Sequence, residues 1–456
     1  MAGIGFELRK LLKRESFIGL LQAYGFAGLI SAGPWVLSIV GVMLIGVMSV
    51  GVVDQSHMVA QFLVSVTYLM AASLILTGAL QLLFTRFVAD RLFEKKHAVI
   101  LPNLMGALTL TTIVSGVTGA LVLSLLFQET VLYRLLMLAC FVTLCNIWIA
   151  VVFLSSMKEY LKILGIFLIG YVITVTAALL LRPYGLEGLL MGFLWGHATL
   201  FFLMLALVLR NHPGDRLIAF DFLPRRQVFY SLAATGLFYN IGIWADKFIF
   251  WFNPLTSEPV IGPLRASVIY DLPIFLAYLS IVPGMAVFLV RLETDFAEQY
   301  DAFYRAVREG DTLANIERIK DNMVYAVRQG IYEIFKVQGL TVVILFLGGP
   351  IILQAIGISP LYIHLFYVDV AAVGMQVVLL AIMNVFFYLD KRRIVLGLSI
   401  FFASVNIGAT LATQYLGPSF YGYGFATAVA LTSVLGLAIL SRKLDRLEYE
   451  TFMLQR

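Results

Sequence analysis

Two neighbouring charged residues, Asp246 and Lys247, lie in the middle of the apolar stretch GLFYNIGIWADKFIFW. A charge at the centre of a bilayer costs on the order of 2.5–3.5 kcal/mol on insertion scales, so such residues face a bundle interior or a water-filled path. Sequence neighbours point about 100° apart on a helix, which predicts poor mutual pairing and separate partners on other helices. We interpret both residues as lining a path; the alternative is ionic packing between helices.

Further acidic and aromatic residues in apolar stretches extend this candidate path. Asp271 lies in SVIYDLPIF and Asp369 in LFYVDVAAVG. The aromatic residues that we expect to line the same cavity are Tyr239, Trp244, Tyr270 and Tyr367. Aromatic side chains with polar tips suit a wet cavity in an apolar wall, and their faces stack on sugar rings. Aromatic residues also gather at membrane interfaces, so interhelical packing remains the alternative for this set.

Motifs for catalysis or cofactor binding are absent from the sequence. It contains no G-x-x-x-x-G-K-[ST] loop, no H-E-x-x-H and no G-x-S-x-G elbow. The five histidines are scattered along the chain. Cys140 and Cys145 are five residues apart and do not align well on a helix, so we interpret them as small buried hydrophobes rather than as metal ligands or a disulfide. We therefore expect neither an enzyme nor a metal or other cofactor.

The elements that must position these residues are membrane-spanning helices. The chain is 61% hydrophobic and 13% charged, with a mean hydropathy of +0.93, whereas an ordinary soluble domain is about 25% charged. A crossing helix needs roughly 20 apolar residues. Twelve stretches meet this need, which predicts an all-α polytopic membrane protein: 23–53, 58–85, 99–127, 131–157, 163–181, 186–209, 227–251, 267–290, 337–356, 361–389, 394–416 and 419–440.

Basic residues predict the orientation of these spans. An even number of crossings returns both termini to one side, and cytoplasmic segments are enriched in Lys and Arg. With cytoplasmic termini, all of the 32 Lys and Arg residues lie on that side except Arg134, Arg182, Lys247 and Arg265. We therefore expect a multi-pass membrane protein with both termini in the cytoplasm. The net charge of +5 follows from this orientation, so that a nucleic-acid partner is not needed to explain it.

The inner segments divide the chain into two predicted six-helix bundles. In order, the divisions are an amphipathic N-terminal segment 1–22, a bundle 23–209, a cytoplasmic linker 210–226, a bundle 227–440 and a cytoplasmic tail 441–456. Such repeats place a transport path at their interface. The second bundle includes the one sizeable soluble segment, a cytoplasmic helical insertion at 291–336.

Helical periodicity within 291–336 predicts two amphipathic helices separated at Gly310 and Asp311. The candidate surface for docking a partner is the stripe Phe296, Tyr300, Phe303 and Val307. The alternative is a helical hairpin that packs on its own bundle.

The N-terminal run MAGIGFELRKLL, followed by GLISAGPW in the first span, resembles the inner-membrane transporters of the Pel exopolysaccharide system. These belong to the polysaccharide-transporter branch of the multidrug/oligosaccharidyl-lipid/polysaccharide (MOP) flippase superfamily. The resemblance implies a fold of two six-helix bundles around a central cavity, with alternating access. It also implies a place in a bacterial inner membrane and export of an N-acetylgalactosamine-rich polymer for the biofilm matrix. It also implies three partners: a cytoplasmic glycosyltransferase, a membrane subunit that senses cyclic-di-GMP, and a membrane subunit with helical repeats.

The resemblance transfers no functional residue, so the cargo is inferred from the charges. Asp246, Asp271 and Asp369 stand against Lys247 in the interior, unlike the arginine-rich surface that a diphosphate-linked lipid requires. A neutral or weakly cationic glycan fits this balance better.

Three other functions remain open. One is a lipid-linked oligosaccharide flippase or an ion-coupled exporter of small molecules, with Asp246, Asp271 or Asp369 as a proton or sodium site. Another is a membrane glycosyltransferase or polymerase, which is disfavoured because the longest outer loop, 252–266, offers only Glu258 as an acid. The last is a scaffold that assembles a polysaccharide synthase without transporting anything.

Overall fold

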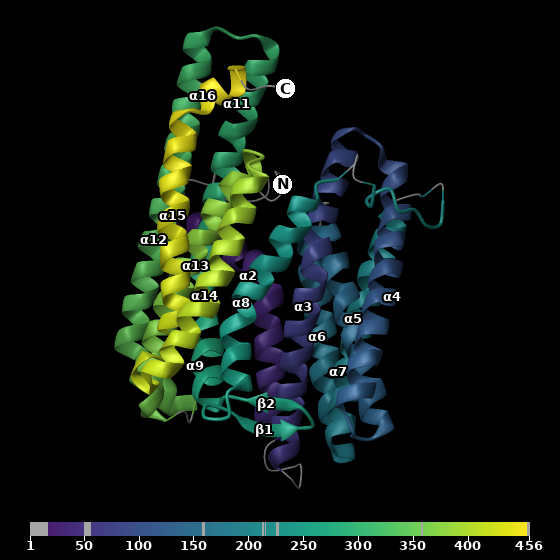
Figure 1. The fold of residues 1–456 in the computed structure, drawn as a ribbon. Coiled ribbons are helices and arrows are strands. Elements are labelled where there is room, and N and C mark those ends of the chain that lie inside the picture. The colour runs from purple at the N-terminus through teal and green to yellow at the C-terminus, as the bar shows by residue number, and fades with distance from the viewer. Residues whose placement is uncertain are drawn as a thin grey trace. The chain divides into compact units, whose positions relative to one another are not determined.

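The computed structural model describes residues 17–453, apart from 50–55, 157–159, 212–213, 215, 225–227 and 357–358. Helices make up most of this part of the chain (Figure 1). They are α2 (Phe17–Ser49), α3 (Ser56–Phe93), α4 (Ile100–Leu126), α5 (Val131–Ser156), α6 (Tyr160–Leu181), α7 (Gly185–Asn211), α8 (Tyr230–Phe252), α9 (Val268–Tyr278), α10 (Ile281–Val290), α11 (Ala297–Glu309), α12 (Leu313–Ile356), α13 (Ile363–Tyr388), α14 (Arg392–Leu416), α15 (Tyr423–Asp445) and α16 (Leu447–Met453).

Short elements connect these helices. They are the 3₁₀ turns η1 (His97–Val99), η2 (Arg182–Tyr184), η4 (Pro360–Tyr362) and η5 (Pro418–Phe420), the π-helical turn η3 (Arg291–Phe296), and the strands β1 (Glu258–Ile261) and β2 (Leu264–Ala266).

Nine helical runs among the described residues are long and apolar enough to cross a membrane. One of them, Lys162–Arg210, contains both α6 and α7, so the nine runs coincide with ten of the predicted spans. The first and seventh predicted spans correspond in position to α2 and α8, which are not among the nine runs. The polytopic helical fold is therefore confirmed, while the number of twelve crossings stays a prediction.

The chain forms two compact units. Unit 1 comprises Met1–Gly33 and Ile269–Arg456, and unit 2 comprises Pro34–Val268. One boundary lies within α2 at Pro34, and α8 belongs to unit 2. These units differ in extent from the bundles proposed above, whose boundaries stay predictions.

Buried aromatic side chains form one core of unit 2. The Phe84 ring centroid lies 5.5 Å from that of Phe222 and 6.4 Å from that of Phe153. Next to Phe222, the Asp221 amide donates to Asn103 Oδ1 on α4 over 2.7 Å, and Asn103 Nδ2 donates to the Asp221 carboxylate over 3.0 Å. The described residues 216–224 of the predicted linker are therefore packed onto α4 at this point.

Two glycines allow α3 and α8 to cross closely within unit 2. A Cβ atom on Gly236 would lie 2.0 Å from the carbonyl oxygen of Gly78, and a Cβ atom on Gly78 would lie 2.8 Å from the carbonyl oxygen of Gly236. Small residues permit this backbone approach in membrane helices. The crossing fixes α8, which carries Asp246 and Lys247, against α3.

A two-stranded hairpin follows α8, where the sequence predicts only the loop 252–266. Strands β1 and β2 pair antiparallel around Gly262, whose φ of 51° is in the left-handed region that glycine favours. Tyr68 on α3 donates its hydroxyl to the Arg265 carbonyl over 2.9 Å, and Gln61 donates to the Val260 carbonyl over 3.3 Å. These long-range contacts dock the hairpin on the end of α3.

In unit 1, α13 is buried on most of its surface and packs against α10, α12 and α15. Helix α11 ends at Gly310 with φ 71°, as the sequence predicts, and α12 then begins at Leu313. The 44 residues of α12 span about 66 Å at 1.5 Å per residue, roughly twice the thickness of a hydrocarbon core. The second predicted amphipathic helix and the following span are therefore one continuous helix.

The predicted docking stripe lies largely within unit 1. Phe296 and Phe303 are fully buried, while Tyr300 and Val307 are half-buried. The ring centroids of Phe296 and Tyr300 lie 5.2 Å and 5.3 Å from that of Tyr388 on α13. The interpretation of this stripe as a docking surface is therefore wrong for the two phenylalanines. Helical periodicity identifies the helix face that is buried, but it does not identify what covers that face.

Helix α16, in the predicted tail, is held to unit 1 by lysines from three other elements, and it lies beside α11 in Figure 1. Lys320 on α12 lies 2.6 Å from Glu448, while Lys391 before α14 and Lys443 on α15 both pair with Glu450. Burial raises the pKa of Glu450, but hydrogen bonds from the two lysines outweigh this effect and hold the pKa below its ordinary value.

We expect acid to release α16. A carboxyl whose pKa is lowered by folding contributes stability above its unfolded pKa of about 4.3, and that contribution is lost as pH falls through the lowered value. A fluorophore on Met453→Cys should keep high anisotropy from neutral pH down to about pH 5 and lose it below about pH 4. Glu450→Gln should lower the anisotropy already at neutral pH, whereas Glu317→Gln, on an exposed part of α12, should leave the curve unchanged. An unaltered curve in Glu450→Gln would show that the contacts of Glu450 with Lys391 and Lys443 do not hold α16 in place.

Candidate translocation site

Asp246 and Lys247 form a buried ion pair on α8. Lys247 Nζ lies 3.0 Å from Asp246 Oδ2, donates to the Ile243 carbonyl over 2.9 Å and lies 5.9 Å from the Trp244 ring centroid. At most 1% of either charged side chain is exposed. The prediction of poor pairing is wrong because the flexible four-carbon stem of lysine bends across the angular offset between neighbours.

This pair and Trp244 are the predicted site residues that the structure brings together in unit 2. Tyr239, on the same helix, is half-buried. Removing one member of a buried pair leaves an uncompensated charge, so the pair stabilises α8 only as a whole. Its role in lining a path stays a prediction.

The predicted residues of unit 1 have different surroundings. Asp369 on α13 is fully buried, and a Cβ atom on Gly422 would lie 3.1 Å from its Oδ1. Asp271 is half-buried in the first turn of α9, where the positive end of the helix dipole stabilises a carboxylate. Its neighbour Tyr270 is fully buried. Asp271 is thus a residue of a helix end rather than of a helix centre.

The eighth predicted span is broken in the middle, between α9 and α10. Pro283 has no N–H, so the carbonyl of Leu279 lacks its regular helical donor. Gln338 on α12 donates its Nε2 to the adjacent carbonyl, that of Ser280, over 2.8 Å. Irregular backbone at membrane depth is tolerated where it is buried in protein or lines a cavity, and broken helices carry the substrate or ion sites of many transporters.

Unsatisfied oxygen atoms remain at this break. Ser280 Oγ and Gln338 Oε1 are buried and have no hydrogen-bond partner among the described residues. Gly284 makes room for the amide, because a Cβ atom there would lie 2.4 Å from Gln338 Oε1. Neutral hydroxyl and amide groups of this kind can bind water or sugar hydroxyls. The break is therefore a polar candidate site that the sequence did not predict.

Tyr367 provides a hydrogen bond at a second interrupted helix, α12. Pro350 within α12 removes the N–H that the carbonyl of Phe346 would accept. The Tyr367 hydroxyl, from α13, donates to that carbonyl over 2.7 Å. This contact explains Tyr367 as a structural partner of α12, so we leave it out of the proposed path.

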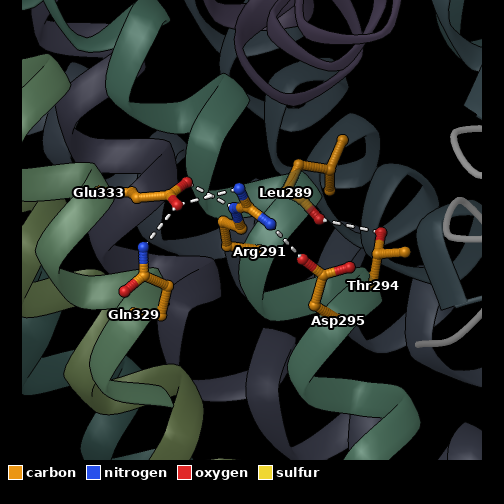
Figure 2. Close-up of polar contacts among 6 residues, drawn as sticks. All are labelled: Leu289, Arg291, Thr294, Asp295, Gln329 and Glu333. Atoms are coloured by element: carbon orange, nitrogen blue, oxygen red, sulfur yellow. Dashed lines mark hydrogen bonds and ion pairs between the residues drawn. The ribbon is translucent and has the colours of Figure 1, made fainter. Parts of the chain in front are cut away.

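The π-helical turn η3 joins α10 to α11, and Figure 2 shows how it is braced. Arg291 donates through Nε and Nη2 to the two carboxylate oxygens of Glu333 on α12, and through Nη1 to Asp295 over 2.8 Å. Gln329 donates to the same Glu333 over 2.9 Å. Thr294 donates to the Leu289 carbonyl over 3.3 Å, one residue further back than in an α-helix. These contacts fix η3 to α12.

The opposite face of η3 is fixed to α13. Glu293 is 6% exposed and accepts hydrogen bonds from Asn384 Nδ2 over 2.8 Å and from the Tyr388 hydroxyl over 2.9 Å. π-helical turns are uncommon and occur frequently at functional sites. Here the turn orients neighbouring side chains toward two different helices, which links α10, α12 and α13.

Sequence reasoning missed Gln338, Glu293 and the Arg291–Glu333 pair. The i, i+4 spacing of Arg291 and Asp295 and the prolines within the spans were the available signals. Neither signal identifies the partner on another helix.

The comparison with protein families decides the identity of the fold and of the function class. The family profile "PelG: Putative exopolysaccharide Exporter (EPS-E)" matches residues 1–452. The chain belongs to the PelG exopolysaccharide exporter family. This family consists of exporters rather than enzymes, and the match confirms the resemblance noted in the sequence. No curated protein matched the chain.

Solved structures with a similar fold are transporters of the MOP superfamily. An outward-facing multidrug resistance MATE transporter has 14% identity and a TM-score of 0.63, over 93% of this chain and 96% of that one. An inward-facing MATE transporter has 12% identity and a TM-score of 0.66, over 91% and 96%. A MOP transporter from Pyrococcus furiosus Vc1 has 15% identity and a TM-score of 0.60, over 92% and 96%. At these identities the likeness shows the MOP fold alone.

We expect Tyr367→Phe to lower stability only while Pro350 is present. Loss of the hydroxyl leaves the Phe346 carbonyl unsatisfied, which costs about 1–3 kcal/mol. In a Pro350→Ala background the backbone N–H returns, so the same substitution should have little effect on the thermal midpoint in detergent. Tyr415→Phe, at a side chain that is 91% exposed, serves as the control. Equal losses in both backgrounds would show that the hydroxyl does not serve this carbonyl.

Single and double substitutions should show whether Asp246 and Lys247 act as a coupled ion pair or as two independent charges. Asp246→Asn or Lys247→Met alone should each destabilise the protein by roughly 3–5 kcal/mol, because the remaining charge is buried without its partner. The double variant should recover most of this loss in thermal unfolding. Arg86→Met breaks a partly exposed i, i+4 pair with Asp90 and should cost less than about 1 kcal/mol. Additive losses in the double variant would contradict the pairing.

Proposed function

We propose that this exporter carries the N-acetylgalactosamine-rich Pel exopolysaccharide, as it is synthesised, across a bacterial inner membrane to the periplasm for the biofilm matrix. The observation that carries this proposal is the match of residues 1–452 to a family of exopolysaccharide exporters. The MOP fold adds a transporter architecture without a nucleotide-binding loop.

The polar groups of the spans support a cargo without phosphate. A lipid diphosphate requires cations, and the mid-span lysine, Lys247, is already neutralised by Asp246. The polar groups at the break in the eighth span, Ser280 and Gln338, are neutral donors and acceptors. Sugar hydroxyls suit such groups better than diphosphates do.

The proposed partners are the subunits of the polymer-making machinery: the cytoplasmic glycosyltransferase, the cyclic-di-GMP receptor and the helical-repeat subunit. The α11–α12 hairpin is the proposed contact, because α12 extends beyond the length of a hydrocarbon core. With Phe296 and Phe303 buried, the hairpin offers its exposed side chains Tyr325, Arg328 and Tyr332 instead.

Reporter fusions test the orientation that this function requires. With twelve crossings and cytoplasmic termini, fusions at Gly185 and Gly417 should report periplasm, while those at Gly214, Gly310 and Arg456 should report cytoplasm. A reversed pattern in either half would refute the proposed topology.

Reconstitution with the cognate synthase tests the transport function. Labelled polymer should become accessible to an external glycosidase only in vesicles that contain the exporter. The Asp246→Asn/Lys247→Met variant, which should keep its fold, should export at least several-fold less polymer if the pair lines the path. Full export by this variant would show that the Asp246–Lys247 pair does not line the path. Synthesis without any export in wild-type vesicles would favour the scaffold.

A further inference from the structure

Unit 2 contains an apolar crevice along α3. Its volume is about 740 Å³, and its walls come from α3, α4, α5, α8 and the β1–β2 hairpin. The small residues Ala72 and Ala79 on α3 lie in it and are half-buried. A second cavity of about 230 Å³ shares Leu76 and Ala79 and continues between α3 and α4. We name the larger of these cavities the α3 crevice.

The polar side chains that line the α3 crevice are already satisfied. Tyr68 donates to the Arg265 carbonyl over 2.9 Å, and Thr118 donates to the Val114 carbonyl over 2.7 Å. A buried water needs two to four polar partners, whereas an apolar cavity stays dry. Water is therefore a poor occupant, and a sugar, whose hydroxyls need partners, is a poorer one.

Exposed apolar side chains line the open side of the crevice. Val122 and Leu126 on α4 and Phe252 at the end of α8 line it, with 46%, 59% and 58% of their surfaces exposed. The α3 and α4 residues concerned lie within two helical runs that can cross a membrane, His57–Phe93 and His97–Leu126. At this depth the surrounding medium consists of lipid chains, and a void there would lose dispersion contacts on its whole lining.

The dimensions match one lipid chain in one leaflet. From Tyr68 to Ala79 the crevice follows α3 for about 16 Å at 1.5 Å per residue, and half of a hydrocarbon core is about 15 Å. The end of the crevice at the hairpin is formed by Phe127, Phe252 and Leu264, which lie at the ends of α4 and α8 and in the hairpin. A chain that enters here has its head group at the hairpin side of the membrane.

We propose that the α3 crevice holds one acyl chain of a bilayer phospholipid, from the leaflet on the hairpin side, as a resident part of unit 2. The acyl chain packs against α3, α4 and α8 beyond the Gly78–Gly236 crossing, where side chains leave the crevice unfilled. Because the lining recognises hydrocarbon and no head group, binding follows chain length and is indifferent to head-group charge. This inference is independent of the exported cargo.

Native mass spectrometry and thermal unfolding of the full chain test the proposal. The wild type, purified in mild detergent, should retain phospholipid, and Ala72→Phe, which fills the crevice, should lose it. After delipidation, the wild-type midpoint should fall by several degrees and be restored equally by phosphatidylethanolamine and phosphatidylglycerol, while that of Ala72→Phe should not respond. Ala206→Phe, at an exposed position of α7, should behave as wild type.

Ala79→Leu fills the same crevice and replaces Ala72→Phe if that variant does not fold. Equal lipid retention in the wild type and in a folded crevice-filling variant would overturn the proposal. Retention of an isoprenoid phosphate instead of a phospholipid would overturn it as well, and would favour a lipid-linked cargo. A response to only one of the two head groups would contradict recognition through the chain.

Discussion

Hydrocarbon offers no hydrogen bonds, and this constraint governs the interior of the exporter. Each interruption of a membrane helix frees a backbone carbonyl that a neighbouring helix must satisfy. The Tyr367 hydroxyl donates to the carbonyl that Pro350 leaves without its helical donor, and Gln338 donates to the Ser280 carbonyl, which is next to the one that Pro283 frees. Every repair ties a broken helix to its neighbour, so that the irregular segments of unit 1 are also the points where α10, α12 and α13 are joined.

Charge follows the same constraint. Asp246 and Lys247 pair with each other on α8, and Arg291 is matched by Glu333 and Asp295. Glu293 receives neutral donors, Asn384 and Tyr388, in place of a cation. Neutral polar groups such as Ser280 Oγ and Gln338 Oε1 lie in the same unit as the matched Arg291 and Glu293. A long polymer that moves through a path must bind weakly at many positions, because conduction requires each site to release its occupant. Neutral contacts meet this requirement better than isolated charges.

The fold was largely predictable from the sequence, because length and hydropathy identify membrane helices directly. The end of α11 at Gly310 was predictable as well, since glycine favours the left-handed conformation found there. The candidate site was less predictable. Helical periodicity indicated that Phe296 and Phe303 are buried. It could not indicate that Tyr388, which is far away in the sequence, packs against Phe296. Likewise, helical geometry places Asp246 and Lys247 apart, and only the reach of the lysine side chain brings them together.

The contrast between α12 and the helix beside it has a mechanical consequence. Helix α12 runs from the hairpin into the membrane as one helix, with Pro350 near its far end, so a displacement at the hairpin moves the segment before Pro350 as a whole. The other arm of the hairpin, α11, instead meets α10 at the π-helical turn η3, which Arg291 and Glu293 brace against α12 and α13. A partner that bound the hairpin, as proposed, would contact two helices that are joined to each other at η3. We expect a displacement of the hairpin to reach the broken span through η3, because α10 continues directly into this turn.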